Sequence, residues 1–244
     1  MEDFIVDLSL EDDDEETIQL GVESSECETS YANYFLGMFL TSSVVNFQVM
    51  RSTLANVWHL IEGVSISDLG NERFLVRFYI EVDVDRVEKN GSWNFNSYLL
   101  VLHWLKEGEY PLSVQLNWVD FWMIIHDLPL GFMSKAIAKQ LGSFIGAFLE
   151  YDTSTTQLGY KRIIRINVRI DVRKSLKRKK NLTLSNGKPI YVRFKYEKLT
   201  LFCFFCGKIG HGESFCLIRA HNPWQEYVFH WDIYLRAQSM KILA

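Results

Sequence analysis

The chain has no apolar run long enough to suggest a membrane span. Its longest uncharged stretch, residues 29–50, is diluted by Ser, Thr, Asn and Gln. The start, Met-Glu-Asp, lacks the basic flank and apolar run of a secretory signal. These absences predict a protein of the nucleus or cytoplasm that is not secreted and does not act at a membrane.

Positive charge is missing from the first fifty residues, which hold twelve acids and no Lys or Arg. The whole chain has 30 acids and 26 basic residues, so the other 194 residues carry 18 acids against 26 bases, about +8. Residues 161–198 alone hold fourteen basic residues and two acids. An acidic leader therefore precedes a basic body, a charge balance suited to a polyanionic partner.

Motifs for hydrolases, nucleotide-binding loops and zinc proteases are absent, since the sequence contains no G-x-S-x-G, Walker loop or H-E-x-x-H. His59, His103 and His126 stand isolated among apolar residues. We therefore expect a protein without enzymatic activity and without a small-molecule substrate.

The hydrophobic pattern predicts an α+β fold. Between residues 34 and 105 the order is β-α-β-β-α-β, which is typical of a ferredoxin-like or RNA-recognition-motif-like unit. A second, β-rich unit follows, with a helix capped by Ser134, a sharply alternating strand at residues 163–172 and a hairpin turn at Asn186-Gly187. No fixed-period repeat is present. The predicted parts are a disordered leader (1–30), the ferredoxin-like unit (31–108), the basic α+β unit (109–199), a zinc knuckle (200–219) and an aromatic C-terminal helix or tail (220–244).

Cysteine is scarce, and three of the four cysteines fall within fourteen residues. Cys203, Cys206, His211 and Cys216 follow the spacing C-x2-C-x4-H-x4-C. Three thiolates and an imidazole suit tetrahedral zinc, and Gly207 and Gly210 permit the tight path between them. We expect one structural Zn²⁺, because four protein ligands leave no open position for a catalytic water. Cys27 stands apart and is interpreted as a free thiol.

Three groups of residues are candidates for contact with single-stranded RNA or DNA. Phe204 and Ile209 of the knuckle are predicted to stack on bases while Lys208 reaches a phosphate, although packing of these side chains against the body is the alternative. The alternating strand places three arginines on one face, and a basic run follows it. The predicted phosphate contacts are Arg165, Arg169, Arg173, Lys174, Lys177, Arg178, Lys179 and Lys180. A solvated loop or a nuclear import signal is the alternative for the run.

Segments along most of the chain resemble a plant domain of unknown function that precedes a CCHC knuckle in gag-like first-open-reading-frame proteins of LINE-type (non-LTR) retrotransposons. The resemblance is carried by residues 47–58, 68–70, 73–78, 91–95, 99–102, 119–122, 126–132, 170–174 and 194–199. It implies an RNA-binding protein with a noncanonical RNA-recognition motif. Phe215 departs from the pattern, because retroviral-type knuckles commonly carry an acid at that position.

The sequence therefore predicts zinc-dependent binding of single-stranded nucleic acid. One departure concerns the first unit, where Phe74, Val76 and Phe78 share one strand face. If helices cover that face, the other face offers arginines and no stacking ring. The second hypothesis is a zinc-stabilised protein-interaction or assembly module, with self-association included, in which the aromatic end of the chain forms the surface.

Overall fold

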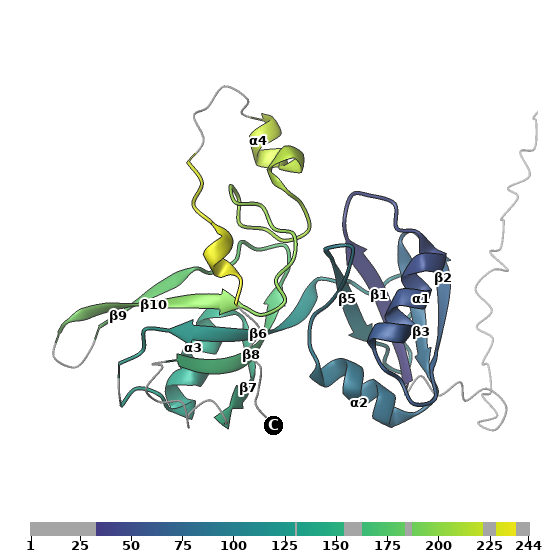
Figure 1. Cartoon of the computed structure of the whole chain (residues 1–244), viewed down its shortest axis with the longest axis horizontal. Helices are drawn as coiled ribbons and strands as arrows, with labels where there is room; N and C mark the ends of the chain where they lie inside the picture. Colours follow the sequence, from purple (N-terminus) through teal and green to yellow (C-terminus); the bar gives the residue numbers. More distant parts are fainter. Residues whose placement is uncertain (1–32, 130, 154–162, 184–186, 222–227, 238–244) are drawn as a thin grey trace, which may run out of the picture. The chain divides into compact units, whose positions relative to one another are not determined.

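The computed structural model describes residues 33–129, 131–153, 163–183, 187–221 and 228–237 (Figure 1). The predicted leader (1–30) lies outside the described residues, as do parts of the predicted C-terminal tail. None of the helices in these ranges is long and apolar enough to cross a membrane.

The first sheet has the predicted ferredoxin-like order. Its strands stand in the order β2-β3-β1-β5-β4, all antiparallel. The short strand β4 was not predicted; it forms a hairpin with β5. The elements are β1 (Tyr34–Leu40), α1 (Phe47–Val57), β2 (Val64–Gly70), β3 (Arg73–Phe78), α2 (Glu81–Lys89), β4 (Trp93–Phe95) and β5 (Tyr98–Trp104).

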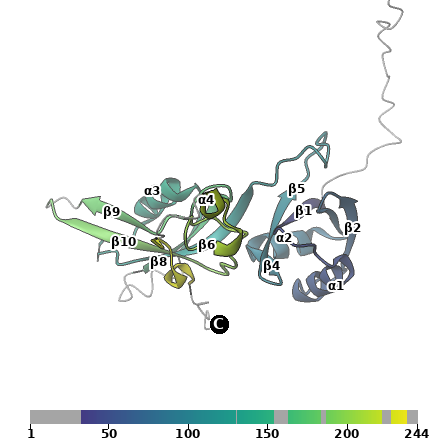
Figure 2. The same ribbon diagram turned by 90° about the horizontal axis from the view of Figure 1, so that it is seen from above.

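Helices α1 and α2 cover one face of this sheet, and both are visible beside it in Figure 2. Helix α1 begins at Asn46, whose side chain accepts a hydrogen bond from Val49 N, as the sequence predicted. The covered face carries the Phe74, Val76 and Phe78 side chains, which are at most 6% exposed.

The opposite face of the first sheet also carries buried apolar side chains. Leu36, Leu99 and Val101 point away from the helices and are at most 1% exposed. They belong to a hydrophobic cluster that includes Phe121 and Val168 of the second sheet. A standard RNA-recognition motif presents aromatic rings on this face. Here the centre of the face is filled with packed aliphatic side chains, and the Tyr34 ring at its margin lies beneath the Arg77 guanidinium at 5.5 Å.

The second sheet repeats the strand order of the first, although the sequence shows no repeat. Its order is β7-β8-β6-β10-β9, again antiparallel, with one helix after the first strand. The segment between β8 and β9, where the first unit has α2, is not helical. The elements are β6 (Trp118–His126), α3 (Lys135–Ile145), β7 (Ala147–Asp152), β8 (Ile163–Asp171), β9 (Lys179–Thr183) and β10 (Pro189–Tyr196).

The chain beyond β10 packs on the second unit rather than forming a separate body. Phe202, Ile209 and Leu235 join the same buried cluster as the strands of the second sheet. Only short helical turns are present among the described residues here: η4 (Glu213–Phe215), α4 (Leu217–His221) and η5 (Ile233–Leu235). The described part of residues 220–244 therefore does not form the single aromatic helix that was one of the two predictions.

The buried carboxylate of Asp83 allows a test of what stabilises the first unit. Asp83 is 0% exposed, and its oxygens accept hydrogen bonds from Ile61 N (2.9 and 3.1 Å) and Glu62 N (3.1 Å). Asp83→Ala leaves these amides without their acceptor, so we expect it to lower the free energy of unfolding by about 2–4 kcal/mol. Urea denaturation measures the change.

Asp85→Ala is the matched control, because Asp85 lies on the same helix but only forms an exposed ion pair with Lys89. Equal stability losses in the two variants would show that the buried carboxylate has no special role.

Candidate zinc centre and nucleic-acid interface

The four predicted zinc ligands converge. One ligand atom from each of Cys203, Cys206, His211 and Cys216 lies within 4.8 Å of every other. Cys206 Sγ and His211 Nε2 are 3.3 Å apart. A tetrahedral ion with Zn–S bonds of about 2.3 Å needs ligand atoms roughly 3.8 Å apart, so the residues present fit zinc. The cluster confirms the predicted ligand arrangement and supports a bound metal ion.

Burial and charge also favour a cation at this centre. The three cysteines are buried, and burial raises the pKa of the Cys203 thiol to about 12, because the thiolate loses its hydration. Burial also lowers the pKa of His211, which keeps the imidazole neutral and able to bind a metal. A dication supplies the positive charge that three neighbouring thiolates need.

Backbone hydrogen bonds shape the loop that holds the ligands. Cys203 N donates to Lys208 O (2.9 Å), and Gly207 N donates to Cys203 O (2.8 Å). Gly207 has a φ of 73°, in the left-handed region that glycine adopts without strain. The Glu213 carboxylate accepts a hydrogen bond from Phe204 N (2.7 Å) and ties the second half of the knuckle to the first.

The knuckle is docked on the basic run. We call residues 174–180 the basic segment. Ser175 Oγ donates to Cys206 O (2.6 Å), and Leu176 N donates to Gly207 O (2.9 Å). Trp231 joins the two parts, because its Nε1 donates to Leu176 O (2.8 Å) and its backbone N to Phe204 O (3.1 Å). A Cβ at Gly207 would lie 2.2 Å from the Trp231 ring. The sequence did not indicate this role of Trp231, because the role depends on a tertiary contact.

The predicted base-stacking residues of the knuckle are not presented to solvent. Ile209 is 6% exposed and pairs with Phe202 inside the hydrophobic cluster. Phe204 is half-buried with its ring 5.0 Å from that of Phe202. This packing corrects the predicted base contact of Ile209 and leaves Phe204 little free surface. Phe215 is instead the exposed ring of the knuckle, at 71%.

The three arginines predicted to share one exposed face, Arg165, Arg169 and Arg173, are each paired with an acid, which competes with their predicted phosphate contacts. Arg165 binds Glu197 and Asp152 and lies over the Trp122 ring at 3.9 Å. The other two arginines form bidentate pairs, Arg169 with Asp120 and Arg173 with Asp171. These hydrogen bonds raise the pKa of Arg169 and lower that of Asp171. A guanidinium that already binds a carboxylate gains little from a phosphate.

The basic segment differs from these three arginines in its contacts. Lys174, Lys177 and Lys179 are exposed, and no ion pair to the segment is present among the described residues. Several of its cations lie over aromatic rings: Lys177 and Lys180 over Phe144, Arg178 over Trp231 and Lys179 over Tyr191. These contacts hold the cations in place without neutralising them.

Lys208 of the knuckle meets the basic segment at one pocket of about 800 Å³. We call it the lysine pocket. It lies between the end of α3 and the knuckle, and Lys174, Lys177 and Lys208 line it together with Trp118 and Phe144. The sequence predicted these lysines separately. It did not predict the two rings, which are distant in the chain.

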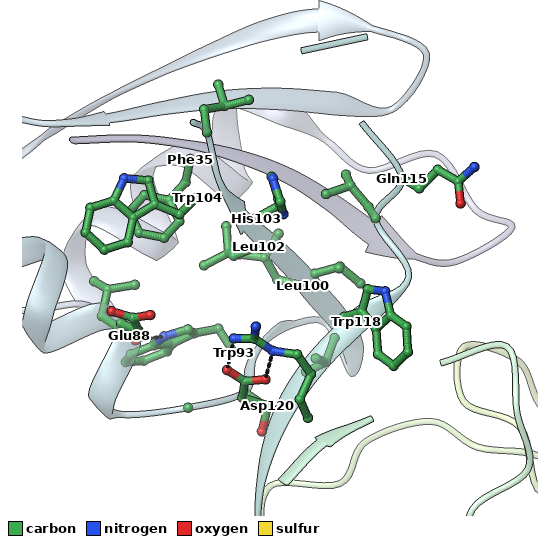
Figure 3. Close-up of a pocket in the computed structure, with 18 of the residues that line it drawn as sticks. Phe35, Glu88, Trp93, Leu100, Leu102, His103, Trp104, Gln115, Trp118 and Asp120 are labelled. Atoms are coloured by element: carbon green, nitrogen blue, oxygen red, sulfur yellow. Dashed lines mark hydrogen bonds and ion pairs between the residues drawn. The ribbon is translucent and has the colours of Figure 1, made fainter. Parts of the chain in front are cut away.

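A second pocket of about 850 Å³ has a different character. Trp93, Trp104 and Trp118 line it with Glu88 and Glu107, and the Asp120–Arg169 pair crosses its wall (Figure 3). Its three acids, Glu88, Glu107 and Asp120, outnumber its two cations, Lys106 and Arg169, so no positive charge is left over for a phosphate. This pocket is therefore not a candidate for a nucleic-acid backbone.

Comparisons with known proteins agree with this organisation. Residues 30–112 match the model of a domain of unknown function, DUF4283, and residues 170–218 match that of the zinc knuckle. The chain carries a DUF4283 domain and a zinc knuckle. The knuckle match begins at the end of β8, so it covers the basic segment and the β9–β10 hairpin as well as the metal ligands.

One curated relative is Uncharacterized protein At4g02000 of Arabidopsis thaliana, 23% identical over 148 residues, which are 59% of this chain and 45% of the relative. The match thus spans less than half of that protein. Among solved structures, the crystal structure of the first two RRM domains of yeast poly(U) binding protein (Pub1) aligns with 67% of this chain and 98% of that one. Its identity is 10% and its TM-score 0.23. The strand order, rather than this match, establishes the ferredoxin-like arrangement.

Loss of one ligand tests the metal centre. We expect Cys216→Ser to reduce bound zinc from about one ion per chain to nearly none, because three remaining ligands hold a structural ion poorly. Metal analysis of the purified protein measures this stoichiometry.

Cys27→Ser is the control, since Cys27 is outside the C-x2-C-x4-H-x4-C motif in the sequence, and it should retain the ion. Full zinc content in Cys216→Ser would exclude Cys216 as a ligand.

Proposed function

We propose that this protein binds single-stranded nucleic acid, RNA in particular, through the zinc knuckle and the basic segment acting as one surface. The observation that carries the proposal is their direct attachment, through Ser175 Oγ to Cys206 O and Leu176 N to Gly207 O. Lysines beside a folded zinc knuckle provide phosphate contacts next to groups that can meet a base. We propose a binding role rather than catalysis, because four protein ligands would fill the coordination of zinc.

The distribution of charge supports placing the surface on the second unit. Both faces of the first sheet carry buried apolar side chains, and the arginines of β8 are paired with carboxylates. The lysines of the basic segment are not so paired within the described ranges. Their phosphate contacts would release condensed counterions and make affinity strongly dependent on salt.

The proposal also concerns the origin of the protein. The resemblance to gag-like first-open-reading-frame proteins predicts that the chain derives from a LINE-type retrotransposon and handles its RNA. This origin remains a prediction from the resemblance.

A protein-interaction role is the second candidate, and one observation favours it. Phe215, Leu217 and Ile218 are 71%, 73% and 50% exposed at the outer end of the knuckle. Adjacent apolar side chains with this exposure can form a contact for another protein or a second copy of the chain. Partner capture that persists after nuclease treatment, by a purified chain that binds no RNA, would favour this role.

The salt dependence of oligonucleotide binding tests the main proposal. For the zinc-loaded chain and a single-stranded oligonucleotide, the logarithm of the association constant should fall linearly with the logarithm of salt concentration. Replacing Lys179 and Lys180 with Gln should make the slope shallower by about 1.4, at about 0.7 per lost phosphate contact. Fluorescence anisotropy at several salt concentrations gives the slopes.

The charge-balanced variant Arg169→Gln/Asp120→Asn is the control, because it removes a guanidinium that is already neutralised. Its slope should match that of the unmodified protein. Binding that ignores both salt and zinc removal would reject the proposed function.

A further inference from the structure

We propose that the lysine pocket holds one nucleotide of the bound strand, with the phosphate on Lys174, Lys177 and Lys208 and the base beside Trp118. This inference rests on the proposed function and assigns it a specific site. The pocket is formed by two segments, since Lys174 and Lys177 come from the basic segment and Lys208 from the zinc knuckle.

The charge of the pocket selects an anion. Four basic residues line it: Arg173, Lys174, Lys177 and Lys208. Asp171 is the single acid among the described residues that line it, and Arg173 engages both of its carboxylate oxygens. The three lysines thus leave about +3 facing a ligand. A phosphate group is the anion that a nucleic acid supplies at each nucleotide.

Another part of the lining suits a base better than a phosphate. Trp118 is 46% exposed, which leaves ring surface for stacking. Residues Ser143, Phe144 and Ile145 form the last turn of α3, where backbone carbonyls lack partners within the helix. These carbonyls can accept hydrogen bonds from the N–H groups of a base. The lysines therefore offer contacts for the phosphate, and Trp118 with the end of α3 offers contacts for the base.

The arrangement of the lysine pocket depends on the folded zinc knuckle, although no zinc ligand lines the pocket. Lys208 stands between Cys206 and His211, so its backbone position depends on the folded knuckle. The bonds from Ser175 and Leu176 to the knuckle also set the path of the basic segment beside Lys174 and Lys177. Because fourteen residues fold only around their metal, zinc removal should separate Lys208 from the other two lysines.

The experiment compares two probes on the zinc-loaded full chain: adenosine 5′-monophosphate and inorganic phosphate. Lys208→Gln should weaken both several-fold, because it removes one of three charges. Trp118→Leu should weaken the nucleotide by about fivefold to a hundredfold, the loss expected for one stacked base, and leave phosphate affinity unchanged. Isothermal titration at low salt measures both. Lys195→Gln and Trp104→Leu are the matched controls, since neither residue lines the lysine pocket.

A single-stranded dodecamer separates the possible failures. If it binds Lys208→Gln and Trp118→Leu as well as the unmodified protein, and only while zinc is present, the pocket is rejected and the proposed function stands. If neither the dodecamer nor the nucleotide binds the unmodified protein, both proposals fail. If Trp118→Leu changes the affinity for nucleotide and phosphate equally, the placement of the base is wrong.

Discussion

The attachment of the zinc knuckle to the basic segment is the contact on which the candidate interface depends. A knuckle has too few residues for a hydrophobic core, so its shape comes from metal ligation. In this chain that shape is continued into the body by hydrogen bonds to the Cys206 and Gly207 carbonyls and by the Trp231 ring. Removal of the metal would therefore disturb residues that do not touch it.

Much of the fold could be predicted from the sequence because its signals are local. The caps Asn46 and Ser134, the alternation along β8 and the Asn186-Gly187 turn signal depend on neighbours in the chain, and the elements beside them formed as expected. Strand β4 has only three residues, Trp93–Phe95, which is too short for a period to be recognised. The sequence also did not reveal that the two units share one strand order. Strand order is set by long-range pairing, and the second unit has no counterpart of α2 among the described residues.

The candidate site also has parts that the sequence predicts and parts that it does not. The zinc ligands were predictable, since their spacing alone brings them together. The pairing of Arg165 was not predictable, because its partners are distant in the sequence: Asp152 ends β7 and Glu197 follows β10. An alternating strand shows which side chains share a face, but it does not show what lies opposite them. The burial of Ile209 could not be predicted either, because the residues that cover it are distant in the sequence.

The attachment of the knuckle also has a consequence for the polarity of a bound strand. A knuckle on a flexible tether can rotate and accept a strand running in either direction, with affinity gained through effective concentration. Here the Trp231 contacts hold the knuckle in one orientation toward the basic segment. A strand that crosses both would therefore meet a fixed sequence of contacts, and one 5′-to-3′ direction should be favoured over the other.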